Sequence, residues 1–193
     1  LYPSLISGKF YGAPYGPVLF LLQKWFYIIL GNSIEVSKLV GVLSSILSFI
    51  ILYFAIHNHY NYKKCLYLIA YILIVFLQFS NWAFWNRSEP IIMLFIGLAL
   101  FGIRQKNIFF SLVLLSIGFG FAVNLKITSV LYMLPIFLLS LRRKSTWFHT
   151  AVICLSLLIM ILPFLYKNIS LSNYLSFIKL AKNEKLYFNL FHD

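Results

Sequence analysis

The most informative short stretch of the sequence is Trp-Asn-Arg-Ser-Glu-Pro at residues 85–90, which joins two apolar runs. Ionisable groups are costly at the depth of a membrane and commonly serve function there. A carboxylate such as Glu89 can act as a general base or hold a divalent cation, and the planar fork of Arg87 suits a phosphate. The alternative is that both residues only end helices at the headgroup level. Pro90 would then lie in a first turn, with Glu89 complementing the helix dipole.

A second cation, Lys126, lies in Asn-Leu-Lys-Ile-Thr-Ser at residues 124–129, again between apolar runs. It could contact an anionic leaving group, or it could be a snorkelling lysine at a helix end. Tyr11 and Tyr15 lie near the start of the chain, among prolines and glycines. Their rings could support the face of a sugar, or they could belong to an interfacial aromatic belt.

Other candidate motifs are weak. His57 and His59 flank Asn58, but no further metal ligand stands at a suitable spacing, which favours a solvated loop. Cys65 and Cys154 lie in or beside apolar runs, which indicates small buried hydrophobic residues rather than a disulfide. The sequence contains no phosphate-binding glycine loop, nucleophile elbow or zinc motif. A divalent cation at Glu89 is therefore the one cofactor that the sequence suggests.

Composition identifies the elements that must position these side chains. Hydrophobic residues make up 62% of the 193 residues and charged residues only 10%, with a mean hydropathy of +0.90. Soluble domains have about 25% charged residues. The bilayer is the solvent that suits such a chain. The net charge of +12 lies in short connectors between apolar runs, which indicates topology signals and lipid headgroups as partners rather than nucleic acid.

The sequence predicts an all-α, polytopic transmembrane bundle with an interfacial helix near the N-terminus. Residues 1–17 are predicted to form a loop, because prolines and glycines gather there. Val18–Leu30 is too short to span the bilayer and carries Gln23 and Lys24, so it is predicted to lie in the interface. Six spans are predicted to follow, at 34–56, 66–85, 90–103, 108–123, 127–141 and 148–166.

Lysine and arginine in the short loops predict the orientation. The connectors 57–65, 104–107 and 142–147 hold most of these loop cations, so they are predicted to be cytoplasmic. Glu89, Arg87 and Lys126 then face the outside, at the plasma membrane if the source is bacterial. Residues 1–166 are predicted to be one membrane-embedded domain. Residues 167–193 are predicted to be an extracytoplasmic loop or an amphipathic segment.

The order of these features resembles a known family. Tyr-Gly-Pro-Val-Leu at 15–19, followed by an apolar run to Gly-Asn-Ser at 31–33, resembles a "P-P-L … L-F-G-x-S" opening. Arg-Ser-Glu-Pro at 87–90 resembles an "R-x-D-P-L-L" step, and Asn-Leu-Lys at 124–126 resembles a "G-L-x-x-K … L-P" step. These are features of the multi-spanning, lipid-linked-sugar glycosyltransferases of the GT-C type. That group includes the protein O-mannosyltransferases, the aminoarabinose transferases of lipid A and the Rgt-type lipopolysaccharide transferases.

The resemblance implies an inverting transfer of a sugar from a polyprenyl or dolichyl phosphate carrier to an extracytoplasmic lipid, glycan or protein. It implies a catalytic role for an acidic residue at the position of Glu89, and contacts from cationic residues such as Arg87 and Lys126 to the carrier phosphate. The family also places a base in its first outer loop, whereas this sequence has no acidic residue before Glu35. We therefore expect a domain that is truncated at its N-terminus. A transporter or flippase and a non-catalytic assembly subunit are the alternatives.

Overall fold

The computed structural model describes residues 15–55, 86–142, 145–167 and 169–183, together with isolated residues between 63 and 73. Most of the predicted span 66–85 and Tyr11 lie outside the described residues. Within the described part every regular element is helical, which confirms the all-α fold class. The helices are α1 (Pro17–Leu30), α2 (Ile34–Ala55), α4 (Glu89–Ile103), α5 (Ile108–Leu125), α6 (Ser129–Leu141), α7 (Thr146–Ile161) and α8 (Leu171–Asn183).

Three of the described helices are long and apolar enough to cross a membrane: Ile34–Ala55, Ile108–Leu125, and Thr146–Leu165, which joins α7 to a 3-10 turn. The sequence predicted that the span from 108 would end at 123, but α5 continues to Leu125. Large apolar side chains on the outside of the bundle are exposed, including Leu131 at 70% and Leu158 at 64%. Such exposure suits lipid contact, and the chain is an integral membrane protein.

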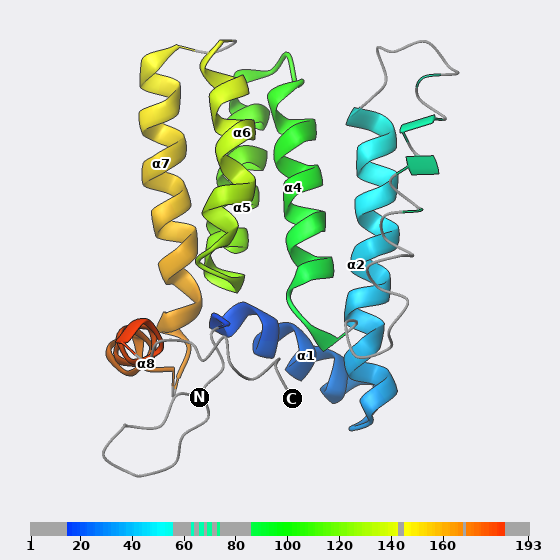
Figure 1. The fold of residues 1–193 in the computed structure, drawn as a ribbon, viewed down its shortest axis with the longest axis vertical. Helices are drawn as coiled ribbons and strands as arrows, with labels where there is room; N and C mark the ends of the chain where they lie inside the picture. The colour runs from blue at the N-terminus through cyan, green and yellow to red at the C-terminus, as the bar shows by residue number, and fades with distance from the viewer. Residues whose placement is uncertain are drawn as a thin grey trace, which may run out of the picture.

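The upright helices form a bundle in which α4 packs between α2 and α5, and α5 packs between α4 and α7 (Figure 1). Gly118 on α5 shows how closely two of these helices approach. A Cβ atom at this position would lie 2.8 Å from the carbonyl oxygen of Phe95 on α4. Small residues let the backbones of membrane helices approach closely, and the resulting packing helps to drive helix association. Ala99 and Leu115 are fully buried in this contact region.

Helix α1 lies across one end of the bundle instead of running along it (Figure 1). Val18 and Leu19 are buried, and Leu22 and Phe26 pack on the same core. The helix ends where Gly31 takes a positive φ of 91° and donates its N–H to the carbonyl of Tyr27. This arrangement confirms the predicted short helix that does not span the bilayer.

Helix α8 also lies at the α1 end of the bundle (Figure 1). Pro163 falls in the 3-10 turn that ends the long span, because proline cannot donate an N–H to a continuing α-helix. The Tyr174 ring packs on Phe164 with their centroids 5.1 Å apart, and burial raises the pKa of its phenol. Leu171–Asn183 of the predicted amphipathic segment therefore form a helix that is anchored to the bundle through an aromatic contact.

Candidate functional site

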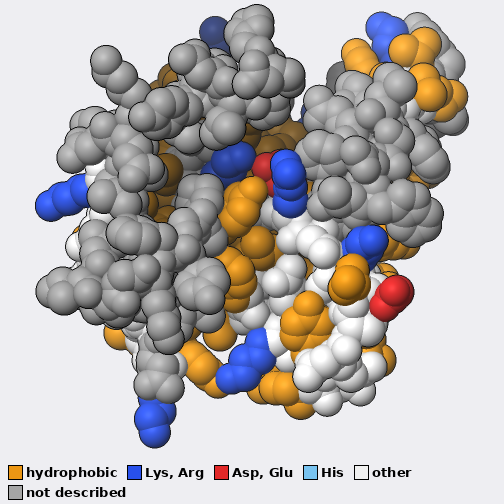
Figure 2. All heavy atoms as spheres, turned by 60° about the horizontal axis from the view of Figure 1, so that its bottom comes forward, with side chains coloured by type: hydrophobic (Ala, Val, Ile, Leu, Met, Phe, Trp, Pro, Cys, Tyr) orange, Lys and Arg blue, Asp and Glu red, His pale blue; other side chains and the backbone are white. Residues whose placement is uncertain are grey.

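The site is an ion pair at the end of the bundle that α1 covers. The Nζ atom of Lys126 lies 3.1 Å from Oε1 of Glu89, and each side chain is 31% exposed. Glu89 is the first residue of α4, and Lys126 directly follows the last residue of α5. Figure 2, which brings this end forward, shows acidic and basic side chains beside each other near its middle. The sequence predicted both residues at one face, and the structure brings their charged groups into contact.

The two oxygens of the Glu89 carboxylate have different surroundings. Oε1 accepts a hydrogen bond from Lys126, whereas Oε2 is buried and has no hydrogen-bond partner among the described residues. A buried acceptor without a partner is costly in a folded protein and is worth explaining. Glu89 also lies in the first turn of its helix beside Pro90, so the helix-start role is present as well. That role does not account for a second, unpartnered oxygen.

Tyr15 reaches the same pair from the start of α1. Residues 15 and 126 form an isolated antiparallel bridge, and the Gly16 N–H donates to the Leu125 carbonyl over 3.2 Å. The Lys126 ammonium lies 6.0 Å from the centroid of the Tyr15 ring, at the outer limit of a cation–π contact. Tyr15 was predicted as a substrate contact, and the structure places it at the site through its backbone.

Asn124 was not predicted to have a role, yet it joins three elements behind the site. Its Oδ1 accepts from the Val18 N–H at the start of α1, over 3.2 Å. Its Nδ2 donates to the carbonyl of Met160 on α7, over 2.7 Å. The side chain is 2% exposed. A polar amide at the turn between two apolar runs was the signal available in the sequence.

Gly16 allows this junction to form. A Cβ atom on Gly16 would collide with the backbone carbonyl of Asn124. The first turn of α1 can therefore approach the end of α5 only if this position has no side chain. Gly16 and Asn124 together fix where Tyr15 lies relative to Lys126.

Replacing Asn124 with alanine is expected to loosen α1 without unfolding the bundle. The change leaves the Val18 N–H and the Met160 carbonyl unpaired, which costs about 1–3 kcal/mol. Hydrogen exchange in the peptide covering α1 should rise by about tenfold or more. Asn107→Ala is the matched control, because Asn107 caps the other end of the same helix. If Asn107→Ala raises exchange in α1 as much, the junction role is wrong.

The segment before Glu89 is held on both sides. The Asn86 carbonyl accepts from Gln23 Nε2 on α1 over 3.2 Å, and the Ser37 hydroxyl on α2 lies 2.7 Å from Asn86 Oδ1. Arg87 is exposed in the turn that follows. Its predicted phosphate contact stays a prediction, as does the substrate contact of Tyr11, which lies outside the described residues.

The predicted divalent cation at Glu89 has incomplete support. Among the described residues, no group of three His, Cys, Asp or Glu side chains is placed to hold a metal ion. Oε1 of Glu89 already accepts from an ammonium. Any cation here would need ligands from elsewhere, so metal binding by Glu89 stays a prediction.

Comparison with known families supplies the deciding observation. The family model described as dolichyl-phosphate-mannose-protein mannosyltransferase matches residues 14–167, which include α1 to α7 and the Glu89–Lys126 pair. The chain belongs to this family. It is therefore a membrane glycosyltransferase of the GT-C type, and the resemblance noted in the sequence is confirmed. No curated protein and no solved structure gives a significant match to the chain.

Membership of the dolichyl-phosphate-mannose-protein mannosyltransferase family favours the transferase interpretation of the charged residues. A transporter and an assembly subunit were the competing interpretations of the same charged residues. The match runs without a break through both segments that carry the ion pair, residues 86–89 and 124–129. The family match therefore favours the transferase interpretation for the end of the bundle where these segments meet.

Proposed function

We propose that the protein moves a sugar from a polyprenyl- or dolichyl-phosphate carrier to an acceptor hydroxyl on the outer side of the membrane, with inversion at the sugar carbon. The observation that carries this proposal is the Glu89–Lys126 pair, in which one carboxylate oxygen is held by an ammonium and the other has no described partner. Glu89 is the proposed base, and Lys126 is the proposed contact to the carrier phosphate.

The chemistry follows from where charge moves. The acceptor oxygen attacks the anomeric carbon, its proton goes to the Glu89 carboxylate, and the bond from that carbon to the phosphate oxygen breaks. The electron pair of that bond leaves with the carrier phosphate, which gains one negative charge. A fixed cation beside a developing charge is an effective way to stabilise such a transition state. Attack on the face opposite the leaving phosphate inverts the anomeric carbon.

The ion pair is suited to this transfer because Lys126 keeps an anionic partner throughout. Before reaction the ammonium faces the Glu89 carboxylate over 3.1 Å. As Glu89 takes the proton it becomes neutral, and the phosphate becomes more negative in the same step. The lysine can therefore shift its hydrogen bonds from the carboxyl group to the phosphate without being left unpaired. Arg87 and Tyr15 are proposed as further donor contacts.

The position of the pair suits a donor with a long apolar tail. Glu89 and Lys126 lie at the ends of α4 and α5, where the apolar bundle meets α1. A carrier lipid can keep its tail in the bilayer while its phosphate reaches this level. We place this end on the outer side, because the opposite connectors hold Arg104, Lys106 and Arg142.

Membranes that contain the protein test the proposal directly. Samples of these membranes are incubated with a radiolabelled sugar. The sugar is supplied either on a polyprenyl phosphate or as the matching nucleotide sugar. The proposal expects the carrier-linked label to be consumed and the nucleotide-linked label to remain, with the opposite anomeric configuration in the product. Consumption of the nucleotide sugar alone would overturn the donor assignment. A product of retained configuration would overturn the single displacement.

A further inference from the structure

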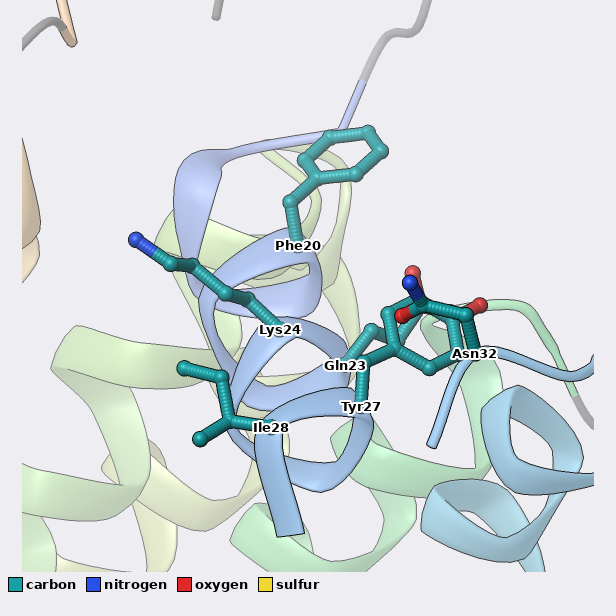
Figure 3. A pocket seen from close by; sticks show the side chains of 6 residues that line it. All are labelled: Phe20, Gln23, Lys24, Tyr27, Ile28 and Asn32. Atoms are coloured by element: carbon teal, nitrogen blue, oxygen red, sulfur yellow. The ribbon is translucent and has the colours of Figure 1, made fainter. Parts of the chain in front are cut away.

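The outward face of α1 carries a pocket whose lining does not include Glu89 or Lys126. A pocket of about 390 Å³ opens there (Figure 3). This volume lies within the range of small-molecule sites, about 300–1,000 Å³. Six side chains line the pocket: Phe20, Gln23, Lys24, Tyr27, Ile28 and Asn32.

The spacing of these residues shows which way the pocket faces. Positions 20, 23, 24, 27 and 28 share one face of a helix, because helical neighbours recur every three or four residues. The opposite face holds the residues that pack into the core, Val18, Leu19, Leu22 and Phe26. Helix α1 lies across the end of the bundle (Figure 1). Its core face packs on the bundle, so its pocket face points away from the helices that span the membrane. A ligand would therefore reach the pocket from the aqueous side.

The lining is suited to a neutral ligand with many hydroxyl groups. Gln23 and Asn32 bring amides, which both donate and accept hydrogen bonds, and Tyr27 adds a phenol. The side chains of Tyr27 and Asn32 have no hydrogen-bond partner among the described residues. The rings of Phe20 and Tyr27 offer flat apolar faces, and the described lining of the pocket has no acidic side chain. Amides beside aromatic rings can bind a sugar ring by its edge and its face.

Lys24 is the one cation among the described residues that line the pocket, and it is already engaged. Lys24 Nζ donates to the Tyr166 hydroxyl over 3.0 Å and lies 4.9 Å from the centroid of the same ring. In Figure 3 the Lys24 side chain points away from Gln23, Tyr27 and Asn32. A phosphate would need this ammonium as its main partner. The pocket therefore favours an uncharged carbohydrate over the carrier phosphate.

The pocket is linked to the reaction centre through one hydrogen bond. Gln23 lines the pocket and donates to the carbonyl of Asn86, which begins the segment that leads to Glu89. We propose that the pocket binds the acceptor as a carbohydrate, on the aqueous side of α1, while the carrier reaches Glu89 and Lys126 from the bilayer. This inference rests on the proposed function for its acceptor role. Carbohydrate binding by the pocket can be measured without turnover.

The first test measures binding of methyl α-D-mannopyranoside to the protein in nanodiscs by saturation-transfer NMR. The parent is expected to bind this probe, because it is an uncharged sugar ring with several hydroxyl groups and no phosphate. Asn32→Ala should weaken binding about threefold to tenfold, as one lost hydrogen bond predicts. Tyr27→Leu should weaken it about tenfold. Trp25→Leu is the matched aromatic control, because Trp25 is 59% exposed on the same helix but does not line the pocket.

The second test is kinetic. In the transfer assay Tyr27→Leu is expected to raise the KM for a carbohydrate acceptor about tenfold, while kcat and the KM for the lipid-linked donor stay unchanged. No binding of the glycoside by the parent, or equal binding by the parent and Tyr27→Leu, would overturn the carbohydrate site. A rise in donor KM alone would overturn the acceptor role. Glycoside binding without any sugar transfer would overturn the proposed function and the acceptor role, leaving only the carbohydrate site.

Discussion

Replacing Glu89 with glutamine is expected to lower the rate of sugar transfer by at least about a hundredfold. A positioned general base contributes about 10²–10⁴-fold to a rate, and the amide cannot accept the proton. The amide keeps the size of the side chain and can still accept a hydrogen bond from Lys126 at the position of Oε1. The helix start and the membrane insertion of the protein should therefore persist. Initial rates with saturating donor, normalised to the amount of inserted protein, measure the effect.

Glu35→Gln is the matched control for this loss. Glu35 is the other acidic residue of the described part, and like Glu89 it lies in the first turn of an apolar helix. It is exposed and forms no described ion pair with Lys126. Its substitution should leave the rate within about twofold of the parent, since surface changes of this kind are usually small. Equal activity of Glu89→Gln and the parent would remove Glu89 from the mechanism.

The sequence predicted which residues lie at the site better than how they are arranged. Glu89 and Lys126 were both predicted at turns on one face, because each follows or precedes an apolar run of helical length. Their contact spans 37 positions of the chain and depends on the packing of α4 against α5. That packing in turn depends on close approach at Gly118, which no periodicity of hydrophobic residues reports. The pair is a consequence of tertiary packing.

Asn124 and Gln23 show the same limit for polar residues. Gln23 was visible as a polar residue in an apolar run, and Asn124 as a polar residue between two such runs. A polar residue in either place predicts only that a partner exists. The partners are backbone groups: the Val18 N–H and the Met160 carbonyl for Asn124, and the Asn86 carbonyl for Gln23. Every non-proline residue offers the same backbone donor and acceptor, so the sequence cannot indicate which ones will be met. Helix α1 was correctly predicted as a short helix, whereas its outward pocket was not predicted.

Replacing Lys126 with methionine is expected to lower kcat about a hundredfold and to raise the KM for the lipid-linked donor. Removing a donor that stabilises developing negative charge commonly costs about 10²–10³-fold in rate. Methionine keeps an unbranched apolar stem at the end of α5 while the charge is lost. If Lys126 only snorkels to the headgroups and its contact with Glu89 is structural, both constants should stay unchanged, because the ammonium would not touch the phosphate. Measuring both kcat and the donor KM therefore separates the two roles.

The double variant Glu89→Gln with Lys126→Met decides whether the pair acts as a unit. If proton transfer and phosphate departure share one step, each single substitution already removes most of the rate acceleration of that step. The double variant should then fall within about tenfold of Glu89→Gln alone, since residues that act together are strongly non-additive. Losses that multiply would mean that the two side chains act independently and that the 3.1 Å contact is only structural. Lys126→Arg should keep part of the rate, because it retains the cation but not the compact ammonium.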